Sequence, residues 1–134
     1  MPANRLNMGL TGIERFPSLK SLHLYQCRKL NRLDALANAQ SIQTIRLSHC
    51  SALNDLSAIA QLHELRVLEI ESCHTISSVA PLAQCKKLQR LQIAGDTVVA
   101  DGDFSLLRKL EELKEVLLAN KKHYSHTAEE LQRN

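Results

Sequence analysis

The sequence predicts an α/β solenoid in which about five parallel strands line a concave face and short helical or 3₁₀ segments return along the convex face. Three observations predict this fold. One apolar pattern occurs three times at a spacing of 23 residues. Each copy begins with an alternation of apolar and polar residues, as a half-buried strand requires. Each copy then places an apolar residue at every third position, which suits turns and short helical segments.

The pattern is clearest in residues 65–82, where it has seven core positions. All seven hold an apolar residue or a cysteine in every copy, and the fourth is always cysteine. The copies are Leu19, Leu22, Leu24, Cys27, Leu30, Leu33, Leu36; Ile42, Ile45, Leu47, Cys50, Leu53, Leu56, Ile59; and Leu65, Leu68, Ile70, Cys73, Ile76, Val79, Leu82. Each repeat is therefore expected to bury its apolar face against its neighbours.

The second half of each copy carries helix signals. Pro81 follows Val79 and Ala80, and proline is tolerated at the first helical position but not inside a central strand. At matching places Asp34 and Ser57 are predicted as helix N-caps. We expect each coil to consist of one strand, one tight turn and one short helical return.

The chain is predicted to be a single domain, residues 1–134. Residues 1–18 form a partial first repeat or an N-terminal cap, residues 19–118 the repeats, and residues 119–134 a C-terminal cap. In the fourth repeat Gly95 and Asp96 replace the small residue and cysteine, and two additional residues are expected within 97–103. In the C-terminal cap, Thr127 and Glu130 predict a capping box.

These repeats resemble the leucine-rich repeat family, whose motif reads LxxLxLxx(N/C)xL. The segment Val79-Ala80-Pro81-Leu82-Ala83 is similar to that of bacterial internalin-like proteins, with repeats of about 22 to 23 residues. The chain departs from that class because cysteine stands where asparagine is usual. The resemblance implies a right-handed coil of bacterial origin that binds proteins.

Composition restricts the partners and the compartment. The chain has 17 basic and 14 acidic residues, a net charge of +3, which does not call for nucleic acid. It has neither a signal-like apolar run at its start nor an apolar stretch of about 18 residues, so we expect a soluble cytoplasmic protein without membrane contact. Three of the four cysteines recur at core positions, which suits free thiols in a reducing compartment.

The candidate binding residues are the strand residues that should point outward onto the concave face. Tyr25 and Arg46 are the predicted anchors, because tyrosine and arginine often dominate interface energies. The alternative is that Arg46 and Glu69 only form a cross-strand ion pair and bind nothing. The full candidate set is His23, Tyr25, Arg46, Ser48, His49, Glu69, Glu71, Arg90 and Gln92.

We expect no catalytic residue, metal or cofactor. Tetrahedral zinc needs ligands that converge on one point, whereas cysteines on successive coils run parallel and no CxxC pair exists. His123 and His126 lack a third ligand, so a solvated cap is the simpler interpretation. Ser48 and His49 lack a residue that could orient them as a catalytic pair.

The sequence therefore predicts a non-catalytic protein-binding module that recognises its partner through the concave strand face. One possible role is a bacterial immunity or inhibitor protein that covers a toxin or effector. Two alternatives stay open: the recognition domain of a larger effector or ligase-type protein, and a structural solenoid that self-associates through Leu10 and Ile13. We expect a monomer or a weak homodimer.

Overall fold

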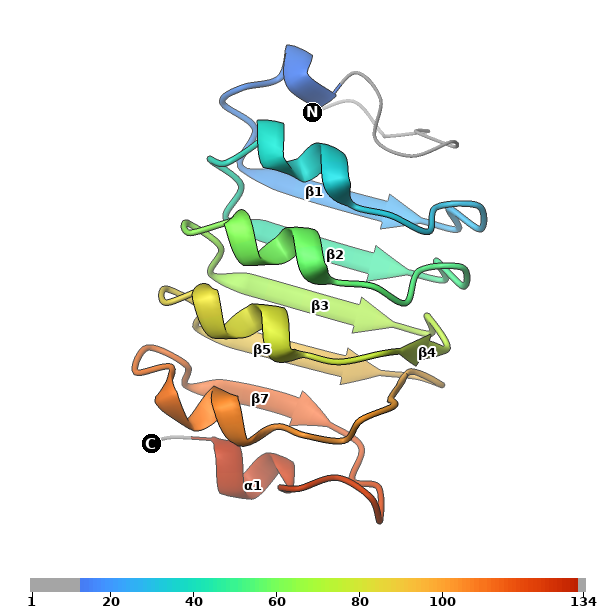
Figure 1. Ribbon diagram of the computed structural model, residues 1–134, viewed down its shortest axis with the longest axis vertical. Coiled ribbons are helices and arrows are strands. Elements are labelled where there is room, and N and C mark those ends of the chain that lie inside the picture. Colours follow the sequence, from blue (N-terminus) through green and yellow to red (C-terminus); the bar gives the residue numbers. More distant parts are fainter. Residues whose placement is uncertain (1–12, 133–134) are drawn as a thin grey trace.

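The computed structural model describes residues 13–132 and shows one solenoid (Figure 1). Five parallel strands form one sheet in the order β1-β2-β3-β5-β7, and five 3₁₀ helices lie on the other side of the core. The strands are β1 Ser21–Tyr25, β2 Thr44–Ser48, β3 Val67–Glu71, β5 Arg90–Ala94 and β7 Glu115–Leu118. The 3₁₀ helices are η1 Ile13–Arg15, η2 Asp34–Asn38, η3 Ser57–Gln61, η4 Ala80–Gln84 and η5 Ser105–Lys109. The predicted stack of parallel strands with helical returns is confirmed.

The period of the sequence sets the register of the sheet. Leu22 is aligned with Ile45, Ile45 with Leu68, and Leu68 with Leu91. In β1, β2, β3 and β5 two residues point inward and are buried, while their neighbours are more exposed, and in β7 Val116 alone is fully buried. Every buried strand residue thus stacks on its counterpart in the next coil. Leu10 lies outside the described residues, whereas Ile13 is buried.

The predicted N-caps at Asp34 and Ser57 are wrong by one position. Both residues are the first of their 3₁₀ helix, and Leu33 and Leu56 occupy the cap positions. The side-chain acceptor lies two residues before the helix starts: Asp55 Oδ1 accepts a hydrogen bond from the Ser57 N–H at 2.9 Å. Such Asx and Ser/Thr turns satisfy the first N–H of a short helix without a standard cap. The corresponding acceptors of η4 and η5 are Ser78 and Asp103.

The recurring cysteines form a buried ladder that tethers neighbouring coils. The Cys50 thiol lies 3.7 Å from the Leu24 carbonyl of the preceding coil and 3.5 Å from the Ser48 carbonyl of its own coil. The Cys73 thiol lies likewise between a carbonyl of the preceding coil, at 3.6 Å, and one of its own coil, at 3.4 Å. Each thiol therefore contacts carbonyls of two adjoining coils and can donate its one proton to either. All four cysteines are free and buried.

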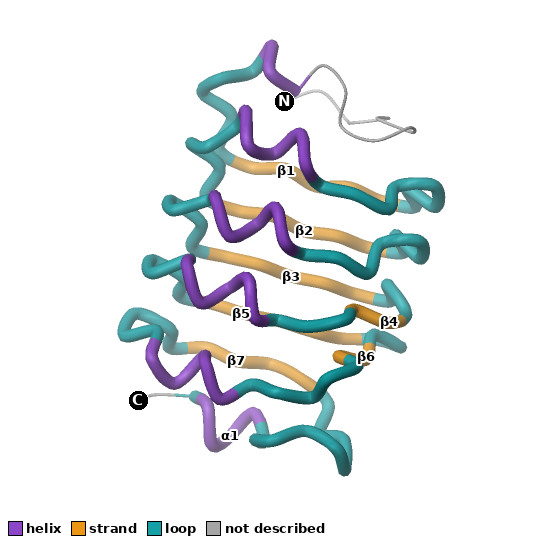
Figure 2. Tube along the Cα trace, in the orientation of Figure 1, coloured by secondary structure: helices purple, strands orange, loops and turns teal. Residues whose placement is uncertain are grey.

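A second sheet of two short strands was not predicted. β4, Thr75–Ile76, pairs in parallel with β6, Val98–Val99, just beyond the turns that follow β3 and β5 (Figure 2). The residues that lengthen the fourth repeat follow β6 in a turn that contains Gly102. Gly102 has φ +61°, and a Cβ there would lie 2.6 Å from the carbonyl oxygen of His123. The turn therefore needs glycine because the C-terminal segment packs directly on it.

That C-terminal segment lies beside the last coil and ends in helix α1, Ala128–Leu131. The capping box predicted at Thr127 and Glu130 is present. The Tyr124 hydroxyl accepts a hydrogen bond from the Val99 N–H at 3.0 Å, and its ring lies edge-on to Phe104. Within residues 13–132, no helix has both the length and the apolar character needed to cross a bilayer.

Candidate binding surface on the sheet

The candidate site is the outward side of the five-stranded sheet, called the sheet face below. Its side chains come from alternate positions of each strand, so the parallel register places them in rows across the coils. The structure brings all of the predicted residues onto this face or onto its edge. The rows are Ser21, Thr44, Val67, Arg90, Glu115; His23, Arg46, Glu69, Gln92, Leu117; and Tyr25, Ser48, Glu71, Ala94.

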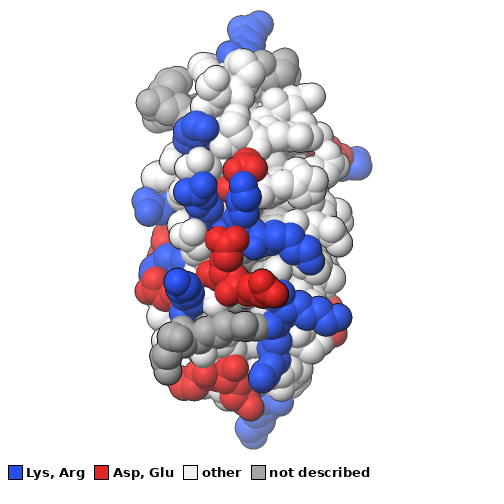
Figure 3. Space-filling model, turned by 90° about the vertical axis from the view of Figure 1, so that its left-hand side faces the viewer, with Lys and Arg blue, Asp and Glu red and all other residues white. Residues whose placement is uncertain are grey.

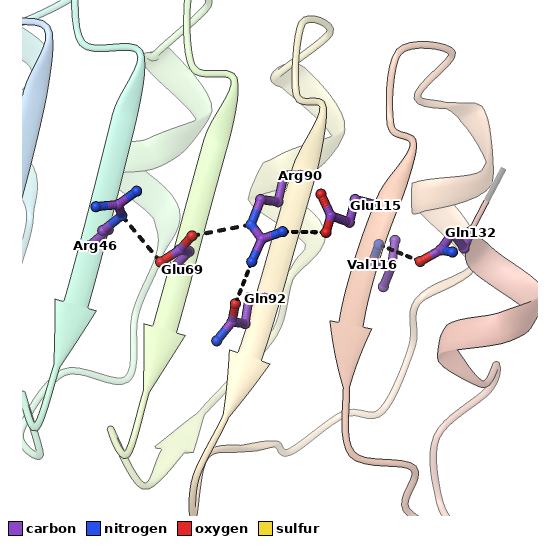
Figure 4. Close-up of polar contacts among 7 residues, drawn as sticks. All are labelled: Arg46, Glu69, Arg90, Gln92, Glu115, Val116 and Gln132. Atoms are coloured by element: carbon purple, nitrogen blue, oxygen red, sulfur yellow. Dashed lines mark hydrogen bonds and ion pairs between the residues drawn. The ribbon is translucent and has the colours of Figure 1, made fainter. Parts of the chain in front are cut away.

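A chain of ion pairs crosses the middle of the sheet face (Figure 4). Glu69 accepts from two arginines: Arg46 Nε lies 3.2 Å from Glu69 Oε1, and Arg90 Nε lies 3.1 Å from Glu69 Oε2. Arg90 continues the chain to Glu115 through a second guanidinium nitrogen. Its remaining nitrogen, Nη2, donates to Gln92 Oε1 at 2.8 Å. The cross-strand ion pair that the sequence offered as an alternative is thus present and extends over four strands.

This series of ion pairs holds the side chains in place and neutralises their charges. Two arginines face two glutamates, so the four groups carry no net charge together. The Glu115 and Glu69 carboxylates hold the pKa of the Arg90 guanidinium above its usual value. Because Glu69 is only 23% exposed, its two arginines are held more firmly than in an isolated surface pair. Arg46, a predicted anchor, is therefore already engaged within the protein.

The other predicted anchor, Tyr25, is available. Tyr25 is 65% exposed, more than any other large apolar residue within residues 13–132, and it packs edge-on against His49 with ring centroids 5.6 Å apart. His49 follows the end of β2 with φ 56°, a left-handed conformation that Gln26 and Ser72 share at the same position of their coils. This turn brings the imidazole of His49 back toward the sheet face beside Tyr25. Simple strand alternation would have sent it to the opposite side.

Glu71 differs from the other acidic residues on the sheet face. It is exposed at the end of β3 and, within residues 13–132, has no ion-pair partner. Ser48 lies between Glu71 and Tyr25 in the same row. The carboxylate of Glu71 is thus the one uncompensated acidic charge among the strand residues of this face.

Sequence reasoning did not extend the candidate set to the last strand of the sheet face, where Glu115 and Leu117 lie. Both lie on β7, where Glu115 pairs with Arg90 and Leu117 is 41% exposed beside Gln92. The signal was present, because shifting Arg90 and Gln92 by the longer spacing of the last repeat gives these two positions. The sheet face therefore carries an exposed apolar residue near each end, Tyr25 and Leu117, with a polar centre between them.

The side on which the strands begin is charged but mixed in sign (Figure 3). Basic and acidic side chains lie interspersed there. Glu64 and Lys87 of adjoining coils are 3.0 Å apart, and this lysine holds the pKa of Glu64 below its usual value. The interspersed signs give this side no extended field of one sign, which a nucleic-acid surface would need.

The residues that could support chemistry are engaged in structural contacts. Burial raises the pKa of the Cys85 thiol to about 11, and burial is also the main cause of the raised pKa of Cys27. His123 Nε2 lies 2.9 Å from the Val99 carbonyl oxygen, whereas His126 Nδ1 lies 2.8 Å from the Ser125 hydroxyl. The two imidazoles of the C-terminal segment thus have separate partners.

Comparison with known proteins supports the fold. Neither protein-family models nor curated proteins give a significant match to the sequence. Among solved structures, internalin C2 from Listeria monocytogenes matches with a TM-score of 0.63 and 24% sequence identity, over 83% of this chain and 49% of that chain. Internalin F from the same organism matches with a TM-score of 0.30 and 16% identity, over 81% and 50%. The chain spans about half the length of each internalin structure, and the first likeness shows the fold that the two chains share.

Proposed function

Because the chain has the leucine-rich repeat fold, we propose that it is a non-catalytic module that binds another protein through the sheet face. The observation that carries the proposal is the distribution of exposed side chains on that face. Tyr25 and Leu117 are exposed near its two ends, and the ion pairs hold the polar side chains between them. Exposed aromatic and aliphatic anchors among ordered polar groups are typical of protein interfaces.

Rigidity supports the same proposal. Five hydrogen-bonded strands fix the backbone of the face, and Glu69 and Arg90 fix the side chains at its centre. Binding would therefore order few additional groups, which reduces the entropic cost of association. With strands about 4.8 Å apart, the sheet is about 20 Å wide, so the contact would be of standard interface size at most.

The particular role we propose is that of an inhibitor-type protein, as a bacterial immunity protein would be, that covers a toxin or effector in the cytoplasm. A recognition domain within a larger protein would use the same face. A structural solenoid that self-associates would instead use the first coil, where Phe16 is 45% exposed and Ile13 is buried. The experiment below separates a partner on the sheet face from contacts of the first coil.

The test uses the wild type and the double variant Tyr25→Ala/Leu117→Ala as baits to capture proteins from the native host. The affinity of each form for the purified partner is then measured. Loss of both exposed anchors should weaken binding at least tenfold, since residues of this kind often dominate interface energies. Far-UV circular dichroism and urea unfolding check that the variant is folded. Neither residue belongs to the buried core, so we expect only a small change in stability.

Phe16→Ala is the matched control. Phe16 is the third exposed large apolar residue in the part of the chain that the structure describes, but it lies in the turn before β1 and outside the sheet face. Binding that survives Phe16→Ala and is lost in Tyr25→Ala/Leu117→Ala supports the proposal. The opposite pattern, with a dimeric mass that Phe16→Ala converts to a monomer, would support self-association through the first coil and contradict the proposed function.

A further inference from the structure

The charges of the sheet face leave one carboxylate uncompensated. Arg46 and Arg90 are paired with Glu69 and Glu115. Glu71 lies two residues beyond Glu69 on the same side of β3, and it has no ion-pair partner within residues 13–132. A partner that covers this face would remove the Glu71 carboxylate from water, and a buried charge needs an opposite charge. The face therefore requires a cation from its partner at this position.

The row that contains Glu71 also supplies an aromatic surface. Tyr25, Ser48 and Glu71 are aligned on three neighbouring strands. Successive strands are about 4.8 Å apart, so the Tyr25 and Glu71 backbones are separated by about 10 Å, with the short Ser48 side chain between them. That separation accommodates an extended aliphatic chain above Ser48. His49, which directly follows Ser48, packs edge-on against the Tyr25 ring and holds it in place.

We propose that the partner protein inserts a lysine or arginine side chain above Ser48, between the Tyr25 ring and the Glu71 carboxylate. This inference rests on the proposed function. The aliphatic part of the basic side chain would pack on the ring, and its charged group would pair with Glu71. An acidic partner residue does not fit, because the arginines of this face are already paired with glutamates.

The test uses a small probe, so that it does not require the partner. Wild type labelled with ¹⁵N is titrated with N-acetyl-arginine amide and, in parallel, with N-acetyl-citrulline amide, which has the same shape without the charge. The arginine probe should cause saturable shifts of the Tyr25, Ser48 and Glu71 amides with a millimolar Kd. The citrulline probe should cause much smaller shifts at the same concentrations.

Variants identify the groups that bind the probe. Glu71→Gln should weaken arginine binding at least fivefold, and Ser48→Lys should abolish it by placing a lysine of the protein itself in that position. Glu111→Gln is the matched control, because it removes an exposed carboxylate that lies outside the sheet face. The amide spectrum of each variant shows directly whether it is folded.

Three results would overturn the inference: no saturable shift at the three amides, equal shifts with citrulline, or unchanged binding in Glu71→Gln. These results are separable from failure of the proposed function. If the probe fails but a partner is captured by wild type and lost in Tyr25→Ala/Leu117→Ala, the sheet face binds a protein without a basic insertion. If the partner is also captured equally by that variant, both proposals fall.

Discussion

At the scale of single residues, Thr97 shows how the cysteine ladder ends. Thr97 is buried, and its Oγ1 accepts a hydrogen bond from the Cys73 N–H at 2.9 Å. Thr97→Val preserves the shape of the side chain but leaves that buried N–H without an acceptor. We expect a loss of about 1–3 kcal/mol in the free energy of unfolding, measured in urea. Thr97→Ser keeps the hydroxyl and should be much closer to wild type; equal losses in both variants would show that packing, not hydrogen bonding, is the role of Thr97.

Thr97 also shows where sequence reasoning stops at this scale. The period of the repeat places the next ladder residue at Asp96, but Asp96 is exposed, and its neighbour Thr97 is buried and contacts Cys73 instead. The buried positions were predictable because each is apolar in every copy. Side-chain partners were less predictable, since they depend on turns such as the left-handed one that carries His49 back to Tyr25.

At the scale of elements, the ion pairs link four strands and give a prediction about stability. Glu69→Gln removes the partner of both Arg46 and Arg90, so we expect a loss of about 0.5–1 kcal/mol that shrinks at high salt. Glu71→Gln is the matched control and should leave the free energy of unfolding unchanged. Urea unfolding at low and high salt measures both. A loss in Glu71→Gln as large as that in Glu69→Gln would contradict the assignment of the ion pairs.

The capping box of α1 gives a prediction about pH. The N–H and then the side chain of Thr127 lower the pKa of Glu130 from its ordinary value of 4.5. A lowered pKa in the folded state means that the ionised carboxylate stabilises the fold above pH 4.5, and that this stabilisation is lost as the pH falls through the folded pKa. Glu130→Ala should therefore lower Tm near neutral pH and have less effect toward pH 3. A Tm difference that stays constant over this range would show that the carboxylate charge contributes nothing.

The elements themselves differ in how far the sequence determines them. The strands and their register follow directly from the repeat, because a slip of one residue would expose the leucines. The starts of the 3₁₀ helices were misplaced, since Asp55 and Ser78 supply acceptors from outside the helix. β4 and β6 are too short to give an alternating pattern of their own. Their pairing became visible only with the turns in place.

At the scale of the whole molecule, the solenoid is a stack in which each coil pairs only with its neighbours, and this can be tested by removing one coil. Deletion of residues 42–64 joins Ser41 to Leu65 and brings β1 beside β3 with the same register, because all coils of this region share one period. The shortened chain should fold and give a far-UV circular dichroism spectrum that contains a strand signal. Its urea m-value should fall by roughly a sixth, because the m-value is proportional to the surface that becomes exposed on unfolding. Deletion of residues 42–53 removes about half a period, so it places loop residues against the core and should not fold. Failure of the full-period deletion, or folding of the half-period one, would mean that contacts beyond adjoining coils determine the structure.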